Sequence, residues 1–136
     1  MIAELIAGMT PGQALKKVLL GTELPDGLYR AIQSAPERKR GELTNSGWAR
    51  HTVESAVWGL VNSLSFEEAV VKVANLGNDA DTAASVTGAL AGAAYGLSGI
   101  PDEWRIALHG EYPRGSGQLW LEQNFIYLAD RLAGLQ

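Results

Sequence analysis

Cysteine is absent from this chain of 136 residues, and its absence excludes several classes of site. Disulfide bonds, zinc–thiolate centres and cysteine nucleophiles all require a thiol. A chain of this length buries roughly two-thirds of its unfolded surface, so a core can form without covalent cross-links. The lack of cysteine also suits a reducing compartment, and we therefore expect a cytoplasmic protein.

Charge is scarce as well, because charged residues make up 19% of the chain and leave a net charge of −4. Nucleic-acid backbones are bound by clustered Lys and Arg side chains. The one basic cluster, Arg38-Lys39-Arg40, is short and typical of a solvated loop. We therefore expect no binding to a nucleic-acid backbone.

Long runs of large apolar residues are missing too. The most apolar segment, residues 83–100, consists mainly of Ala and Gly, which gain little from lipid, and no basic flank follows it. The first nine residues have no basic region and include Glu4, unlike a signal peptide. We expect no association with a membrane, and we interpret residues 83–100 as a buried helix.

Strand-like alternation is not found at any useful length, and the apolar spacing is helical nearly throughout. Thr10 before Pro11 predicts a helix start, and Ser65 with Glu68 predicts a capping box. Residues 36–47 are polar and predict a loop. The first four predicted helices run from Pro11 to Leu20, from Pro25 to before Pro36, through Val53–Leu64 and through Ala69–Val73. A loop at 76–80 then leads into a small-residue helix that ends around Gly96 to Gly99. Two more helices are predicted, one from Pro101 through Leu108 and one through Phe125–Leu132 after a Gly-rich turn at 113–118. Residues 1–136 are thus expected to form one all-α domain, a compact orthogonal bundle of about six to eight helices.

An acidic turn stands out from this helical pattern in the stretch NLGNDADTAASVTGALAGAAYG, residues 75–96. Asp79 and Asp81 flank one residue at the start of a helix, and Thr82 follows directly. Two carboxylates and a hydroxyl that point the same way are hard oxygen donors, which suit Mg²⁺. The same position also fits a simple N-cap, in which one Asp accepts from free backbone N–H groups. The residues alone leave both interpretations open.

The helix after the acidic turn is built from small residues. Ala84, Gly88, Gly92 and Gly96 recur every four positions and predict one smooth face. Neighbouring backbones can approach such a face closely. A helix held in that way would keep the ligands at its N-terminus in fixed positions.

Two segments together carry a resemblance to a known family. GNDADTAASVTGALAGAAYG (77–96) resembles the C-terminal metal motif of the ADP-ribosylglycohydrolase family, an Asp-x-Asp-Thr turn that leads into a small-residue helix. SGWARHTVESAVWGL (46–60) is similar to that family's Ser-Gly-aromatic loop and the long helix after it. The spacing between the segments and SGIPDEW (98–104) match as well, so the resemblance covers about residues 44–108.

The resemblance implies a fold, an activity and a metal centre. Asp79, Asp81 and Thr82 would be ligands in a binuclear Mg²⁺ centre. The family hydrolyses the glycosidic bond at the anomeric carbon of ADP-ribose attached to a protein side chain or a small acceptor. The metals would hold the ribose hydroxyls and orient a water molecule. The expected ligand is therefore ADP-ribose or an ADP-ribosylated substrate.

The resemblance also implies a set of substrate-binding residues: Ser46, Gly47, Trp48 and Asn78. Ser46 and Gly47 would offer donors near the diphosphate, and Trp48 an aromatic face for the nucleotide. For His51 both a supporting role near this pocket and direct contact with substrate remain open.

The chain departs from the family pattern in its N-terminal part. The family's first half opens with a Gly-Asp-Ala-Leu-Gly-type segment and supplies a Thr-Asp-Asp turn, and neither is present. Only half of the metal ligands are therefore expected here, and no catalytic residue is assigned. Three interpretations remain: a truncated or split hydrolase that needs its missing half, a non-catalytic ADP-ribose-binding module, and a structural remnant that self-associates. In each case we expect a homo-oligomer or a complementing N-terminal subunit.

Overall fold

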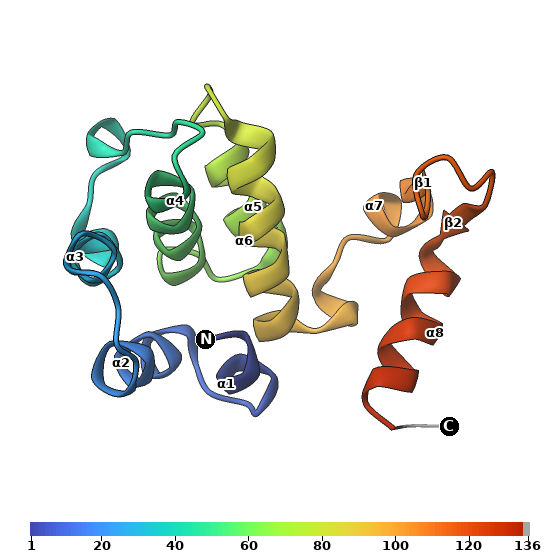
Figure 1. Ribbon diagram of the computed structural model, residues 1–136, viewed down its shortest axis with the longest axis horizontal. Coiled ribbons are helices and arrows are strands. Elements are labelled where there is room, and N and C mark those ends of the chain that lie inside the picture. The colour runs from blue at the N-terminus through green and yellow to red at the C-terminus, as the bar shows by residue number, and fades with distance from the viewer. Residues whose placement is uncertain (135–136) are drawn as a thin grey trace. The chain divides into compact units, whose positions relative to one another are not determined.

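Figure 1 shows the protein as a computed structural model that describes residues 1–134, so the last two residues of the predicted domain lie outside it. The chain divides into two compact units, one from Met1 to Ile100 and the other from Pro101 onward.

Helices account for every long element of both units, which confirms the all-α class. The first unit contains α1 (Ile2–Ile6), α2 (Pro11–Gly21), α3 (Asp26–Ser34), α4 (Ala49–Val61), α5 (Phe66–Ala74), α6 (Ala80–Tyr95) and short 3₁₀ turns at Ala35–Glu37, Arg40–Glu42 and Leu97–Gly99. The second contains α7 (Asp102–Ala107), β1 (His109–Glu111), β2 (Leu119–Leu121) and α8 (Glu122–Leu132). No helix within residues 1–134 is long and apolar enough to cross a membrane.

Two predicted helix starts are observed with their caps. At α2, the Gln13 N–H donates to Thr10 Oγ1 at 3.4 Å, and the Thr10 N–H donates to Gln13 Oε1 at 3.0 Å. At α5, the Glu68 N–H donates to Ser65 Oγ at 3.1 Å. The Glu68 carboxylate, however, accepts from the Leu64 N–H at 2.7 Å, one residue before the position that a strict capping box requires.

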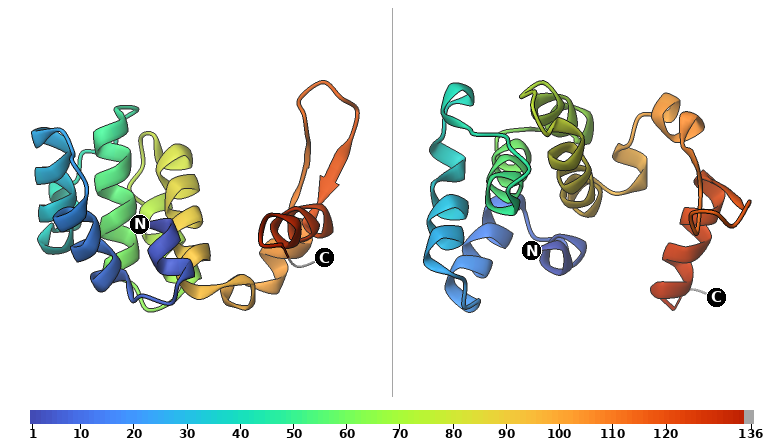
Figure 2. Two further views of the ribbon diagram at one scale, coloured as in Figure 1. Left: turned by 60° about the horizontal axis from the view of Figure 1, so that its bottom comes forward. Right: turned by 45° about the horizontal axis from the view of Figure 1, so that its top comes forward.

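The core of the first unit is centred on α4, which lies between α3 on one side and α5 with α6 on the other (Figures 1 and 2). Residues 54–60 of this helix are all buried. A Cβ atom on Gly59 would overlap the Val73 side chain of α5 and lie 3.2 Å from the carbonyl oxygen of Ala69 and 3.4 Å from Thr87 Cγ2 of α6. At Gly59, α4 therefore packs closely against both α5 and α6.

The buried face of α6 differs from the predicted one, and the prediction of a closely packed stripe at Ala84, Gly88, Gly92 and Gly96 was wrong. A Cβ on Gly88 would meet no atom within 4 Å, a Cβ on Gly92 would make only an ordinary contact with Phe66 at 4.0 Å, and Gly96 ends the helix at a φ of 71°. The buried residues of α6 are Ala83, Thr87, Leu90 and Ala91. Because burial is favourable in proportion to apolar area, the helix turns its leucine inward rather than its glycines.

A β-hairpin in the second unit corrects the prediction that the chain has no strands. His109 pairs with Leu121 and Glu111 with Leu119 in antiparallel register. Each strand has only three residues, too few for alternation to be visible in the sequence. The predicted Gly-rich turn forms the hairpin loop, visible in Figure 2, and α7 ends at Ala107, before the predicted Leu108.

Candidate functional site

Asp79 stands at the N-terminus of α6, where a simple helix cap was one of the two interpretations. Its side chain accepts no capping hydrogen bond from the backbone of the helix. Instead, the Thr82 hydroxyl donates to Asp79 Oδ1 at 2.9 Å. This bond uses the hydroxyl proton and leaves lone pairs on the Thr82 oxygen, so both side chains retain oxygen acceptors for a cation.

Asp81 lies in the first turn of the same helix, and its side chain is exposed. Its carboxylate makes no hydrogen bond or ion pair with any residue that the structure describes. Asp79 and Asp81 together place two negative charges at the positive end of the α6 dipole, which stabilises them there. The acidic turn, residues 77–82, is thus a compact set of oxygen donors whose second carboxylate has no internal partner.

The Ser-Gly-Trp loop, residues 45–48, lies against the acidic turn. The Asp79 N–H donates to the Asn45 carbonyl oxygen at 3.4 Å, and Asn45 Nδ2 donates to the Gly77 carbonyl oxygen at 2.7 Å. A Cβ on Gly47 would lie 3.7 Å from Asp79 Oδ2. The structure therefore brings together the two segments in which the substrate-binding and metal-binding residues were predicted.

Asn45 is the residue at this junction that the sequence patterns did not single out. Its side chain is 2% exposed, and its Oδ1 atom has no hydrogen-bond partner in the described part of the chain. The sequence does contain a feature that could have identified Asn45: an Asn directly before Ser46-Gly47 in a predicted loop is well suited to hydrogen-bond a neighbouring backbone segment. Asn45 thus holds the loop and the turn together.

The remaining loop residues form a cluster around Trp48. Ser46 Oγ lies 2.8 Å from His51 Nδ1 and accepts from the Trp48 N–H at 3.4 Å. The His51 ring packs edge-to-face with Trp48 at 5.0 Å between centroids, and Arg50 Cζ lies 4.0 Å from the centre of the Trp48 ring. In this structure His51 supports the loop, and Arg50, which was not predicted, covers one face of the exposed indole.

Asn78 has a left-handed backbone with φ of 54°, directly after Gly77 at 78°. Asparagine tolerates this conformation better than most residues other than glycine. Two such residues in succession turn the chain from α5 into α6. The Asn78 side chain is exposed, so contact with substrate remains a prediction, and the role observed is that of a turn residue.

Comparison with known sequences identifies the family. The sequence pattern of the ADP-ribosylglycohydrolases matches residues 1–136. The chain belongs to this family. An ADP-ribosylarginine hydrolase Tri1 of Serratia proteamaculans (strain 568) is 47% identical over 68 residues, which cover 50% of this chain and 19% of that protein. The enzyme of the same name from Pseudomonas putida (strain GB-1) is 44% identical over 68 residues, covering 50% of this chain and 18% of the relative. The matched part is thus less than a fifth of either relative.

Metal binding at the acidic turn remains a prediction. No group of three or more His, Cys, Asp or Glu side chains is arranged for metal binding within residues 1–134. The predicted ligands Asp79, Asp81 and Thr82 offer two carboxylates and one hydroxyl. Hard oxygen donors of this kind fit Mg²⁺, which keeps several water molecules when it binds protein. Further protein ligands would have to come from outside this set.

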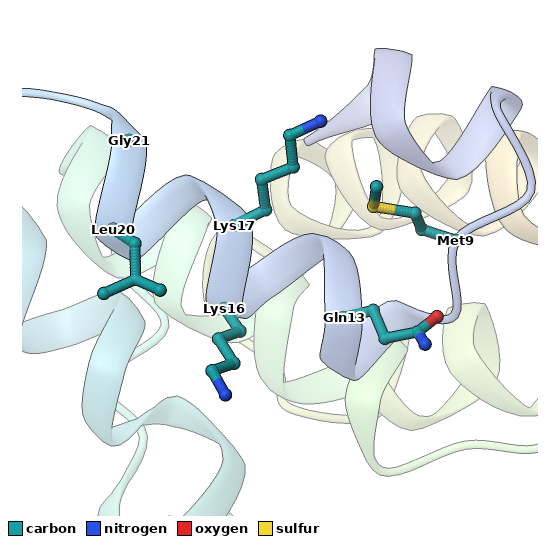
Figure 3. Close-up of a pocket in the computed structure, with 6 residues that line it drawn as sticks. All are labelled: Met9, Gln13, Lys16, Lys17, Leu20 and Gly21. Carbon is teal, nitrogen blue, oxygen red and sulfur yellow. The ribbon is translucent and has the colours of Figure 1, made fainter.

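A cavity of about 470 Å³ lies elsewhere in the first unit, along α2. Figure 3 shows that Lys16 and Lys17 extend from α2 in different directions, with Met9 at the entry to the helix. No residue of the acidic turn or of the Ser-Gly-Trp loop lines this cavity. It is therefore not part of the candidate site.

Proposed function

We propose that this chain provides the Mg²⁺-binding and ADP-ribose-binding part of a hydrolase that acts on ADP-ribosyl conjugates. The contact between the Ser-Gly-Trp loop and the acidic turn carries the proposal. Since Gly47 lies beside Asp79, a diphosphate at the loop and a cation at the turn would be neighbours. A divalent cation next to a diphosphate stabilises the negative charge of the diphosphate.

The roles of the chain's own residues follow from this arrangement. Asp79, Asp81 and Thr82 would hold the cation, and bound Mg²⁺ would supply Lewis-acid polarisation and orient a water molecule. Ser46 and Gly47 would position the diphosphate, with Trp48 beside the nucleotide. In the hydrolysis, water adds a hydroxyl group to the anomeric carbon, the bond to the acceptor breaks, and the acceptor receives the proton. No residue of this chain is assigned the proton transfer.

The acceptor that we propose to test first is arginine, because both relatives are named ADP-ribosylarginine hydrolases. The aligned part covers 19% and 18% of these relatives. We propose that a complementing subunit or a second copy of this chain contributes further residues to the site. A cytoplasmic location remains a prediction from the cysteine-free composition.

Calorimetric titration of ADP-ribose into the purified chain tests the proposal, first with Mg²⁺ and then with EDTA. We expect binding that requires Mg²⁺ and is lost in Asp81→Asn. Asp130→Asn, which removes the same charge from an exposed position on α8, is the matched control and should bind like the unmodified chain. Release of ADP-ribose from ADP-ribosylarginine is then measured with the same samples.

The outcomes separate the three interpretations. Mg²⁺-dependent binding without hydrolysis supports an incomplete enzyme site, whose activity should appear when the complementing part is added. Binding that is insensitive to EDTA and to Asp81→Asn favours a non-catalytic ADP-ribose-binding module. Absence of binding in both buffers contradicts the proposal and favours a structural remnant.

A further inference from the structure

A second polar cavity, of about 350 Å³, lies between α3 and α4 and is distinct from the acidic turn. We call it the arginine cleft. The residues that line it include Asp26, Gly27, Arg30, Arg38, Arg50 and Glu54. Three of the eleven basic residues of an acidic protein thus surround one cavity. Folding alone does not require this gathering, since arginine side chains usually project into solvent.

The charges of the arginine cleft do not cancel. Arg38 Nε lies 3.2 Å from Glu54 Oε1, and because Glu54 is buried, this pair is satisfied within the protein. Arg30 and Arg50 make no ion pair with any carboxylate in the described part of the chain. The remaining carboxylate, Asp26, is exposed in the first turn of α3, where the helix dipole stabilises it. Three guanidinium groups against two carboxylates leave the cleft positive.

Arg50 is held in place before any ligand arrives. Its guanidinium carbon lies 4.0 Å from the centre of the Trp48 ring. A Cβ on Gly27 would lie 3.3 Å from Arg50 Nη1, so the glycine leaves room for the arginine to reach from α4 across to α3. A guanidinium stacked by its face keeps the N–H donors at its edge available for an anion. Fixing the side chain in advance reduces the entropy lost when a ligand binds.

We propose that the arginine cleft binds a phosphoryl group through Arg30 and Arg50. Two guanidinium groups can donate several charge-assisted hydrogen bonds to the oxygens of one phosphate. The site is separate from the Ser46-Gly47 diphosphate contact, and Arg50 connects the two through Trp48. The choice of a nucleotide as the source of this group rests on the proposed function; free inorganic phosphate is the other source.

The test is a titration of inorganic phosphate into the whole chain. Binding is monitored by ¹⁵N NMR, and chloride keeps the ionic strength constant. We expect saturable shifts of backbone amides along residues 26–34 and 50–54. Arg30→Gln and Arg50→Gln should each weaken binding by about tenfold or more, the usual loss for a charge-assisted hydrogen bond. Arg114→Gln, at the exposed hairpin loop, removes the same charge and should bind phosphate like the unmodified chain.

A folding control and a conservative variant make the test specific to the guanidinium groups. Circular dichroism establishes that each variant is folded, and Arg50→Lys, which keeps the charge without the planar fork, should still bind less tightly than the unmodified chain. Linear, unsaturable shifts, or equal losses in Arg114→Gln and Arg50→Gln, would overturn the proposal. Tighter binding of ADP than of phosphate, with both weakened by Arg50→Gln, identifies a nucleotide as the source; equal affinities identify free phosphate.

Phosphate binding at the arginine cleft is independent of the fate of the proposed function. Asp81→Asn should leave phosphate binding at the arginine cleft unchanged while it abolishes Mg²⁺-dependent binding of ADP-ribose. If ADP-ribose does not bind but phosphate does, the hydrolase proposal fails and the arginine cleft stands. If ADP-ribose binds normally to Arg30→Gln and phosphate never saturates, the arginine cleft fails alone.

Discussion

Single residues connect distant parts of this chain, and Asn45 does so at the candidate site. Its amide donates to the Gly77 carbonyl oxygen at 2.7 Å, across 32 positions of sequence. Because the side chain is almost fully buried, this bond is shielded from competition with water. One buried amide thus fixes the distance between the loop that would hold the diphosphate and the turn that would hold the cation.

Glu68 is a residue whose hydrogen bonds make stability depend on pH. Hydrogen bonds from the Leu64 N–H and then from Lys72 hold the pKa of this carboxyl below its ordinary value of 4.5. A lowered pKa in the folded state stabilises the protein above the unfolded pKa, and this contribution disappears as the pH falls through the folded value. We therefore expect the free energy of unfolding to decrease as the pH drops below about 4.5.

Urea unfolding at pH 6 and pH 3 measures this effect, with conditions chosen to span the pKa values of carboxyl groups. In Glu68→Gln, the difference in the free energy of unfolding between pH 6 and pH 3 should be smaller than in the unmodified chain. Glu67→Gln, at an exposed position beside it, should retain the full difference. An unchanged difference in Glu68→Gln would show that its hydrogen bonds do not favour the ionised form.

At the scale of elements, the packing of α4, α5 and α6 depends on one glycine. Since a Cβ at Gly59 would overlap Val73 and crowd the Ala69 carbonyl oxygen, Gly59→Ala should separate the helices. Overpacking of this kind costs about 1–3 kcal/mol, and the better helix propensity of alanine returns up to about 1 kcal/mol. With that gain in full, the expected net change is a loss of up to about 2 kcal/mol in the free energy of unfolding, measured by urea denaturation.

Gly88→Ala in α6 is the matched control. A Cβ at this position would meet no atom within 4 Å, so only the helix propensity changes. The substitution should raise the free energy of unfolding by about 0.5–1 kcal/mol. Destabilisation by Gly88→Ala instead would mean that this face of α6 is packed closely after all, as the small-residue stripe had predicted.

On the scale of the whole molecule, the two units differ in how their side chains are buried. All buried residues lie between Leu5 and Ala91, and none of the described residues from 101 to 134 is buried. A segment this short rarely forms a stable core alone. Its exposed large hydrophobic residues are Ile106, Leu108, Tyr112, Leu119, Leu121, Phe125, Tyr127, Leu128 and Leu132. We expect these side chains to form the contact between copies in the predicted homo-oligomer.

Removal of the second unit tests whether it mediates self-association. A chain that ends at Ile100 should unfold cooperatively within a few degrees of the full chain, since it keeps every buried residue. Light scattering should find self-association in the full chain and a monomer after truncation. A full chain that stays monomeric at high concentration would contradict the predicted homo-oligomer. A further truncation that deletes α6 should abolish folding and serves as the control.

The helix starts at Thr10 and Ser65 and the turn from Asp79 to Thr82 could be predicted from the sequence, because caps and turns depend on residues a few positions apart. The resemblance of two short segments was likewise enough to predict the family. Three features follow from long-range packing: the buried face of α6, the close approach of α5 and α6 at Gly59, and the link that Asn45 makes between the Ser-Gly-Trp loop and the acidic turn. These features depend on partners far away in sequence, so no local pattern could specify them. The arginine cleft is of the same kind, since its donors come from two helices that meet only in the folded chain.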